Sequence, residues 1–246
     1  MMITMKKISI LLVTIGLFLL ATPLSSHATL LTFADPSGLS ASADFTLIDP
    51  ITLGIVLTNT STGYPSGFSN SDQLLTSIAF DLPGSIAITG GTAVISPSSY
   101  SVNFDMGYYG AGANVSPEWG YGNEGSTGFE TRVNFVSTIV AGTTTKFAIG
   151  NLDGPSSLDG PQGGLTNGLI DMGSELGAIR NSVIFTLTLG NTIPDLSFLD
   201  NGAIVEFGSD KAFVPNTPVP EPATMLLFGS GLVGLAAFGR KKFFKK

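Results

Sequence analysis

Few residues of this chain carry side chains that commonly catalyse reactions. The sequence has no cysteine and a single histidine, His27, which lies in an N-terminal segment that we expect to be removed. Without these residue types, a Ser-His-Asp triad, a Cys-His pair and the usual zinc sites are excluded from the mature chain. Two carboxylates would be enough for a glycosidase, but no spacing singles out a pair, and we therefore expect that the protein is not an enzyme. The carboxylates considered are Asp105, Glu118, Glu124 and Glu130.

A second group of oxygen-bearing side chains lies in a repeated tetrapeptide. Leu152-Asp153-Gly154-Pro155 recurs six residues later as Leu158-Asp159-Gly160-Pro161. With Asp171, these segments could supply oxygen ligands to Ca²⁺ outside the cell, although the spacing does not match an EF-hand loop. Asp-Gly-Pro is also ordinary turn chemistry, and we favour that interpretation. We expect no cofactor, with Ca²⁺ as the alternative at Asn151, Asp153 and Asp159.

Aromatic residues gather in a glycine-rich stretch, residues 107–128. They are Tyr108, Tyr109, Trp119 and Tyr121. One interpretation is an aromatic platform that makes the domain a carbohydrate-binding or adhesive surface module. The other, which we favour, is a long connection whose Trp119 packs onto a sheet, since long loops are often but not always functional.

The elements that must position these residues are short strands. In the segment 183–189, the apolar residues Val183, Phe185, Leu187 and Leu189 alternate with Ile184, Thr186 and Thr188, which is the period of a half-buried strand. Similar segments recur between Gly, Pro, Asn and Asp turns, and no long segment has a helical period. Segments 43–48 and 51–57, for example, are separated by a break at Asp49-Pro50. Residues 29–215 are therefore predicted to form an all-β domain, an antiparallel β-sandwich of jelly-roll type.

The N-terminal residues have the pattern of a secretory signal peptide. Lys6 and Lys7 precede the apolar stretch 8–20, and Ser26-His27-Ala28 places small residues at the positions that signal peptidase reads. We predict a signal helix in residues 1–28, export by the Sec machinery and cleavage after Ala28.

The C-terminal residues predict a single transmembrane helix. Residues 216–222 read as a proline-rich linker, residues 223–239 are apolar, and residues 240–246 form a basic tail. By the positive-inside rule the tail stays in the cytoplasm and the preceding domain lies outside. The residues that fix this topology are Arg240, Lys241, Lys242, Lys245 and Lys246.

The charge distribution agrees with an exported domain. All 18 acidic residues lie between residues 29 and 221, together with only four of the 11 basic residues. Such an acidic surface repels phosphate backbones, so nucleic acid is excluded as a partner.

Pro220-Glu221-Pro222, followed by an apolar helix and a basic tail, resembles the PEP-CTERM sorting signal of Gram-negative bacteria. The resemblance implies that Pro220, Glu221 and Pro222 are recognised by exosortase, a membrane-embedded processing enzyme. It also implies an intermediate anchored in the inner membrane and delivery to the cell surface or the extracellular polysaccharide matrix, with exopolysaccharide as a further partner.

The body has a resemblance of its own. The Trp119 loop, the segment from Asn151 to Pro155 with Asp159-Gly160, and the late strand 182–189 resemble a family of exosortase-dependent surface proteins without an assigned activity. That family implies no catalytic residue for this chain.

Overall fold

The computed structural model describes residues 28–62, 73–102, 109–123, 132–138, 145–146, 164–167, 178–208 and 212–217. These residues form strands with a few short 3₁₀ turns, which confirms the all-β prediction. Within them, no helix has both the length and the apolar character needed to cross a membrane. The predicted signal helix (residues 1–27 of it) and the predicted transmembrane helix lie outside the described residues.

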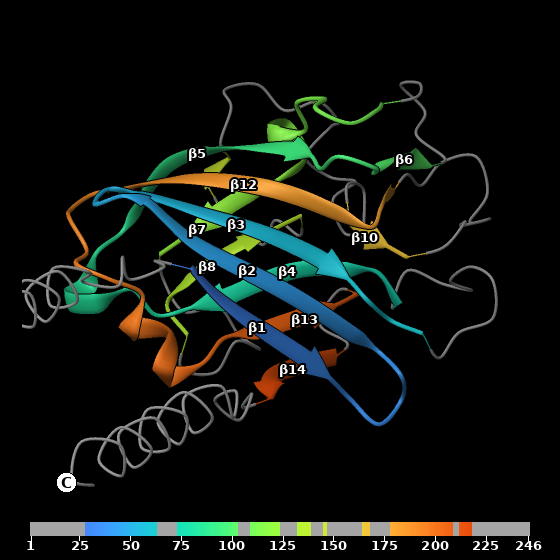
Figure 1. Ribbon diagram of the computed structural model, residues 1–246, viewed down its shortest axis with the longest axis horizontal. Coiled ribbons are helices and arrows are strands. Elements are labelled where there is room, and N and C mark those ends of the chain that lie inside the picture. The colour runs from blue at the N-terminus through green and yellow to red at the C-terminus, as the bar shows by residue number, and fades with distance from the viewer. Residues whose placement is uncertain are drawn as a thin grey trace, which may run out of the picture.

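The layer that faces the viewer in Figure 1 is a five-stranded antiparallel sheet in the order β5-β12-β3-β2-β1. Its strands are the longest in the described part of the chain, with seven to ten residues each. Their bounds are β1 Ala28–Ala34, β2 Ser40–Asp49, β3 Thr52–Asn59, β5 Ile88–Ile95 and β12 Ser182–Leu189.

A second layer lies behind the first and is built from shorter strands in the order β14-β13-β4-β8-β7. The bounds are β14 Ala212–Thr217, β13 Ile204–Phe207, β4 Leu75–Phe80, β8 Asn134–Ser137 and β7 Gly120–Gly122. Four smaller strands extend it, β6 Tyr100–Val102, β9 Thr145–Lys146, β10 Leu165–Thr166 and β11 Ala178–Arg180. All pairings are antiparallel except β10 with β11.

The two layers are joined into one nearly closed, sandwich-like sheet. On one side β1 pairs with β14, where Thr32 lies opposite Thr217 and Phe33 opposite Asn216. On the other side, the Asn123 side chain bonds both backbone polar groups of Ile88 in β5, as a neighbouring strand would. Its Oδ1 accepts the Ile88 N–H at 2.7 Å and its Nδ2 donates to the Ile88 carbonyl at 2.8 Å.

The core fills the space between the layers, as the alternation of residues 183–189 predicts. Val183, Phe185, Leu187 and Leu189 are buried, whereas Thr188 on the other face is exposed. Aromatic rings interlock across the layers, with Phe45 of β2 and Phe80 of β4 in an edge-to-face contact at 5.5 Å between ring centroids. The apolar interior therefore fixes which face of each strand points inward.

The break predicted at Asp49-Pro50 is the turn between β2 and β3. The Asp49 side chain accepts the Ile51 N–H at 2.9 Å, which gives this backbone donor of the turn a partner two residues away. This turn lies at the same end of the sheet as the start of β1, because Ala28 is opposite Thr46.

Candidate functional site

The first and the last strand of the sandwich, β1 and β14, lie side by side. β1 and β14 are antiparallel neighbours, so β1 begins and β14 ends at the same end of the sheet (Figure 1). We call this end the exit end. It is formed by the start of β1 at Ala28 and by the β2–β3 turn. β14 runs toward this end but stops at Thr217, which lies opposite Thr32, four residues from Ala28.

The folded domain continues further toward the C terminus than the sequence predicts. We expected a linker to begin at residue 216, but Asn216 and Thr217 are strand residues that pair with Phe33 and Thr32. The reason is that β1 offers them backbone partners, which local composition does not reveal. The first two residues of the predicted linker therefore belong to β14.

Two hydrogen bonds between Asn216 and Ala203 hold β14 one residue before its end, and we call this contact the clasp. The Asn216 N–H donates to the Ala203 carbonyl at 2.9 Å, and the Asn216 Oδ1 accepts the Ala203 N–H at 2.9 Å. Gly202 makes room for it, because a Cβ at this position would lie 2.2 Å from Asn216 Oδ1. Gly202 also has a φ of 80°, which glycine adopts without strain.

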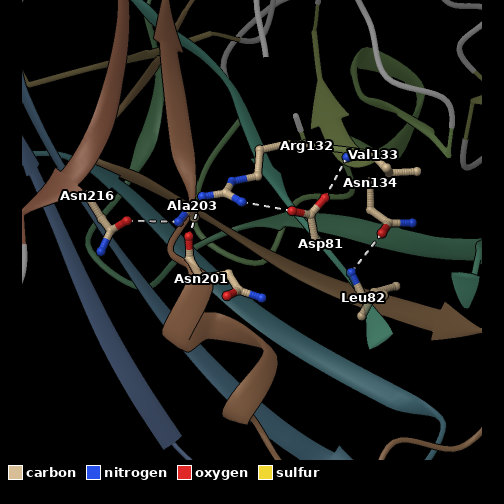
Figure 2. A network of polar contacts seen from close by, with 8 residues as sticks. All are labelled: Asp81, Leu82, Arg132, Val133, Asn134, Asn201, Ala203 and Asn216. Carbon is tan, nitrogen blue, oxygen red and sulfur yellow. Dashed lines mark hydrogen bonds and ion pairs between the residues drawn. The ribbon is translucent and has the colours of Figure 1, made fainter. Parts of the chain in front are cut away.

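A charged pair continues the clasp around the exit end (Figure 2). Arg132 donates from Nη1 to Asp81 Oδ2 at 2.8 Å and from Nη2 to the Asn201 carbonyl. The second oxygen of Asp81 accepts the Val133 N–H at 2.8 Å. The pair is largely shielded from water, with exposed fractions of 16% for Arg132 and 26% for Asp81. It thereby ties the end of β4 to the segments before β8 and β13.

Two asparagines complete the network. Asn134 Oδ1 accepts the Leu82 N–H at 2.9 Å, and its Nδ2 donates to Asn123 Oδ1 at 3.0 Å. From Asn216 to Asn123, polar side chains thus secure successive strands at the exit end. Sequence reasoning missed these residues. A signal was present, since Asn and Asp after a strand commonly bond nearby backbone groups.

The residues that the structure describes do not form the aromatic platform, which was the less favoured of the two interpretations. Trp119 is fully buried and packs edge-to-face on Phe185, with 4.8 Å between centroids. Tyr121 is buried and donates its hydroxyl to the Thr89 carbonyl at 2.9 Å, and Tyr109 packs half-buried against the core. Tyr108 lies outside the described residues. The structure therefore corrects the ligand-contact hypothesis for Trp119 and Tyr121 and agrees with the core interpretation.

The remaining candidate residues fall mostly outside the described part of the chain. Asn151, Asp153 and Asp159 of the calcium hypothesis lie there, as do the sorting residues Pro220, Glu221 and Pro222 and the basic residues from Arg240 to Lys246. Within the described part, no group of three or more His, Cys, Asp or Glu side chains could hold a metal ion. Glu118 is buried beside Trp119, and Ala28 is the exposed first residue of β1.

Comparison with known proteins assigns the segment that follows β14. The model of the PEP-CTERM protein-sorting motif matches residues 218–242, which include Pro220, Glu221 and Pro222. No curated protein and no solved structure was found to match the chain. The match starts at the residue after Thr217, so the clasped strand and the motif are contiguous. This chain is therefore a protein that carries a PEP-CTERM sorting motif at residues 218–242.

Proposed function

We propose that this chain is a non-enzymatic exported protein that exosortase processes at its PEP-CTERM segment and that is then delivered to the cell surface or the extracellular polysaccharide matrix. The sorting motif at residues 218–242 carries this proposal. Before processing, the apolar segment after Pro222 anchors the protein in the inner membrane, with the sandwich outside and the basic tail in the cytoplasm.

The contiguity of strand and motif supports this order of events. Pro220 follows Thr217 by three residues, so it lies within about 10 Å of the end of the sheet even when the chain is fully extended. The enzyme must therefore read a short peptide held close to a folded domain. Each proline disfavours helix in the residue before it, so the sequence predicts a motif that exosortase reads as an extended peptide.

The position of β1 supports the same topology. The predicted signal cleavage after Ala28 is at the exit end, and β14 runs toward this end, with the motif beginning after Thr217. A domain with both ends at one side can face the membrane with that side during export and anchoring. The opposite end then points away from the membrane.

Mass spectrometry of the mature C terminus tests the proposal in cells with and without exosortase. We expect a C terminus shortened near Pro222 in the first strain and an intact one ending at Lys246 in the second. Pro220→Ala should block the shortening, whereas Pro215→Ala, an exposed proline of β14 outside the motif, should not. An intact Lys246 tail in both strains would overturn the processing step.

The non-enzymatic role rests on the residue types of the mature chain. Removal of the signal peptide leaves no histidine, and the sequence has no cysteine. Incubation of the purified protein with a panel of polysaccharides tests this part of the proposal. Release of shorter sugars that disappears on substitution of a carboxylate would contradict it.

A further inference from the structure

Four large apolar side chains are exposed in the described part of the chain, and all four lie at the exit end. Their exposed fractions are 56% for Leu30, 57% for Ile48, 44% for Ile51 and 44% for Val133. Leu30 is near the start of β1, and Ile48 and Ile51 flank the tip of the β2–β3 turn. Val133 directly precedes β8, whose first residue lies opposite Phe80 at the end of β4.

The strand registers show that these positions share one end of the sandwich. Ala28 lies opposite Thr46, which brings the β2–β3 turn beside the start of β1. Asn134, the residue after Val133, donates its Nδ2 to the Ile86 carbonyl at 3.2 Å. Ile88 lies opposite Leu189, whose N–H donates to the Ile51 carbonyl at 2.9 Å, so the start of β8 is connected to the β2–β3 turn through the start of β5. Exposed apolar residues are normal when scattered, but a set confined to one end of a domain indicates a contact surface.

A shallow hollow lies next to the turn and is largely apolar. It has a volume of about 590 Å³, and its lining residues are Leu47, Ile48, Asp49, Pro50, Thr192, Ile193 and Pro194. At the opposite end of the sheet, the described turns expose Pro36, Ser37, Thr60, Pro97 and Ser98 but no large apolar side chain. The two ends of the sandwich therefore differ in chemistry.

We infer that the exit end rests on the phospholipid bilayer while the chain is anchored, with Ile48 and Ile51 in the interfacial layer. This inference rests on the proposed function and adds a contact that the sorting motif does not require. The length of the tether supports it. Ala223, the first residue of the apolar segment, follows Thr217 by six residues, so β14 ends within about 20 Å of the membrane boundary.

The charges at this end indicate how the contact is made. Asp44 and Asp49 are exposed close to Leu30 and Ile48, so anionic headgroups do not attract this surface. The contact is therefore apolar. It depends on the anchor, because two exposed isoleucines, Ile48 and Ile51, bind a bilayer only weakly by themselves. Zwitterionic phosphatidylcholine is consequently a suitable test membrane.

The absence of cysteine from the sequence allows a direct experiment on the full chain. Ile51→Cys places an environment-sensitive fluorophore at the tip of the β2–β3 turn. Ala34→Cys places the same label at the exposed last residue of β1, which lies at the opposite end of the sheet. Each labelled chain is purified in detergent and reconstituted into phosphatidylcholine vesicles, with brominated acyl chains as quencher in a parallel sample. Flotation of the vesicles reports whether the chain is anchored.

We expect the Ile51→Cys label to shift to the blue and to be quenched by the brominated lipid, whereas the Ala34→Cys label does neither. If the chain floats with the vesicles but both labels stay in water, the bilayer contact is wrong and the anchor stands. If the chain does not float, the anchor of the proposed function is wrong and the contact fails with it. A blue shift that grows with the amount of protein per vesicle would assign Ile51 to a contact between two copies and would also overturn the inference.

Discussion

Thr217, the last residue of β14, lies directly opposite Thr32 of β1, and the PEP-CTERM motif begins at the next residue. This pairing places the start of the processed segment at the edge of the five-stranded sheet. Because the two strands are antiparallel, it also places the beginning of β1 on the side toward which β14 runs. The position of the sorting motif relative to the folded domain is thus set by one strand pairing.

A disulfide can report this register. The Cα atoms of directly opposite residues in an antiparallel pair are about 4.5–5.5 Å apart, which falls within the span of a disulfide. We expect the double variant Thr32→Cys/Thr217→Cys to cross-link under mild oxidation, as measured by loss of free thiols. Leu30→Cys/Thr217→Cys is the control, since its two positions are diagonal neighbours about 7–8 Å apart. Equal cross-linking of both pairs would contradict the register.

The clasp at Asn216 predicts an unusual cost for a small substitution. Gly202→Ala brings a Cβ to 2.2 Å from Asn216 Oδ1, so the amide must move and the Ala203 N–H loses its acceptor. Gly112→Ala is the matched control, because Gly112 has the same φ of 80° but no atom within 4 Å of an added Cβ. We expect Gly202→Ala to lower the free energy of unfolding by about 1 kcal/mol more than Gly112→Ala, as measured by urea denaturation. Equal losses would mean that backbone strain alone explains the effect.

The ion pair at the exit end predicts a measurable coupling. Asp81 and Arg132 are mostly shielded from solvent and share two further hydrogen bonds with the backbone. A double-mutant cycle with Asp81→Ala and Arg132→Ala should give a coupling energy of about 1–2 kcal/mol in urea denaturation. The cycle of Asp81→Ala with Arg180→Ala should give a value near zero, since Arg180 stacks on Tyr100 instead. A coupling near zero in the first cycle would show that the pair contributes nothing to stability.

The burial of the only tryptophan predicts a spectroscopic signature. Trp119 has no exposed surface and packs on Phe185, so its emission in the native protein should be blue-shifted and resistant to acrylamide. Trp119→Ala should lower the free energy of unfolding by about 3–5 kcal/mol, because it removes a large core side chain. Trp119→Phe should cost less, since an aromatic ring remains in place. Native emission that acrylamide quenches as readily as free tryptophan would contradict the core position.

Much of the fold was predictable because it depends on local pattern. The alternation of residues 183–189 and the Asp49-Pro50 turn are both present as expected, since period-two burial and turn chemistry act over a few residues. The order of the strands was not predictable, because β5 pairs with β12 and β4 with β13 across 88 residues of sequence or more. The clasp of Asn216, Arg132 and Asp81 was missed for the same reason.

The PEP-CTERM sorting motif can be identified without a structure, because it is a linear peptide recognised by the type and order of its residues. The two interpretations of Trp119 were separated only by the folded chain, since burial depends on the strands that cover a side chain. The tertiary structure also decided that β14 extends to Thr217 and that Leu30, Ile48, Ile51 and Val133 share one end of the sandwich. These relationships join residues far apart in the chain, and the pairing of distant strands is what creates them.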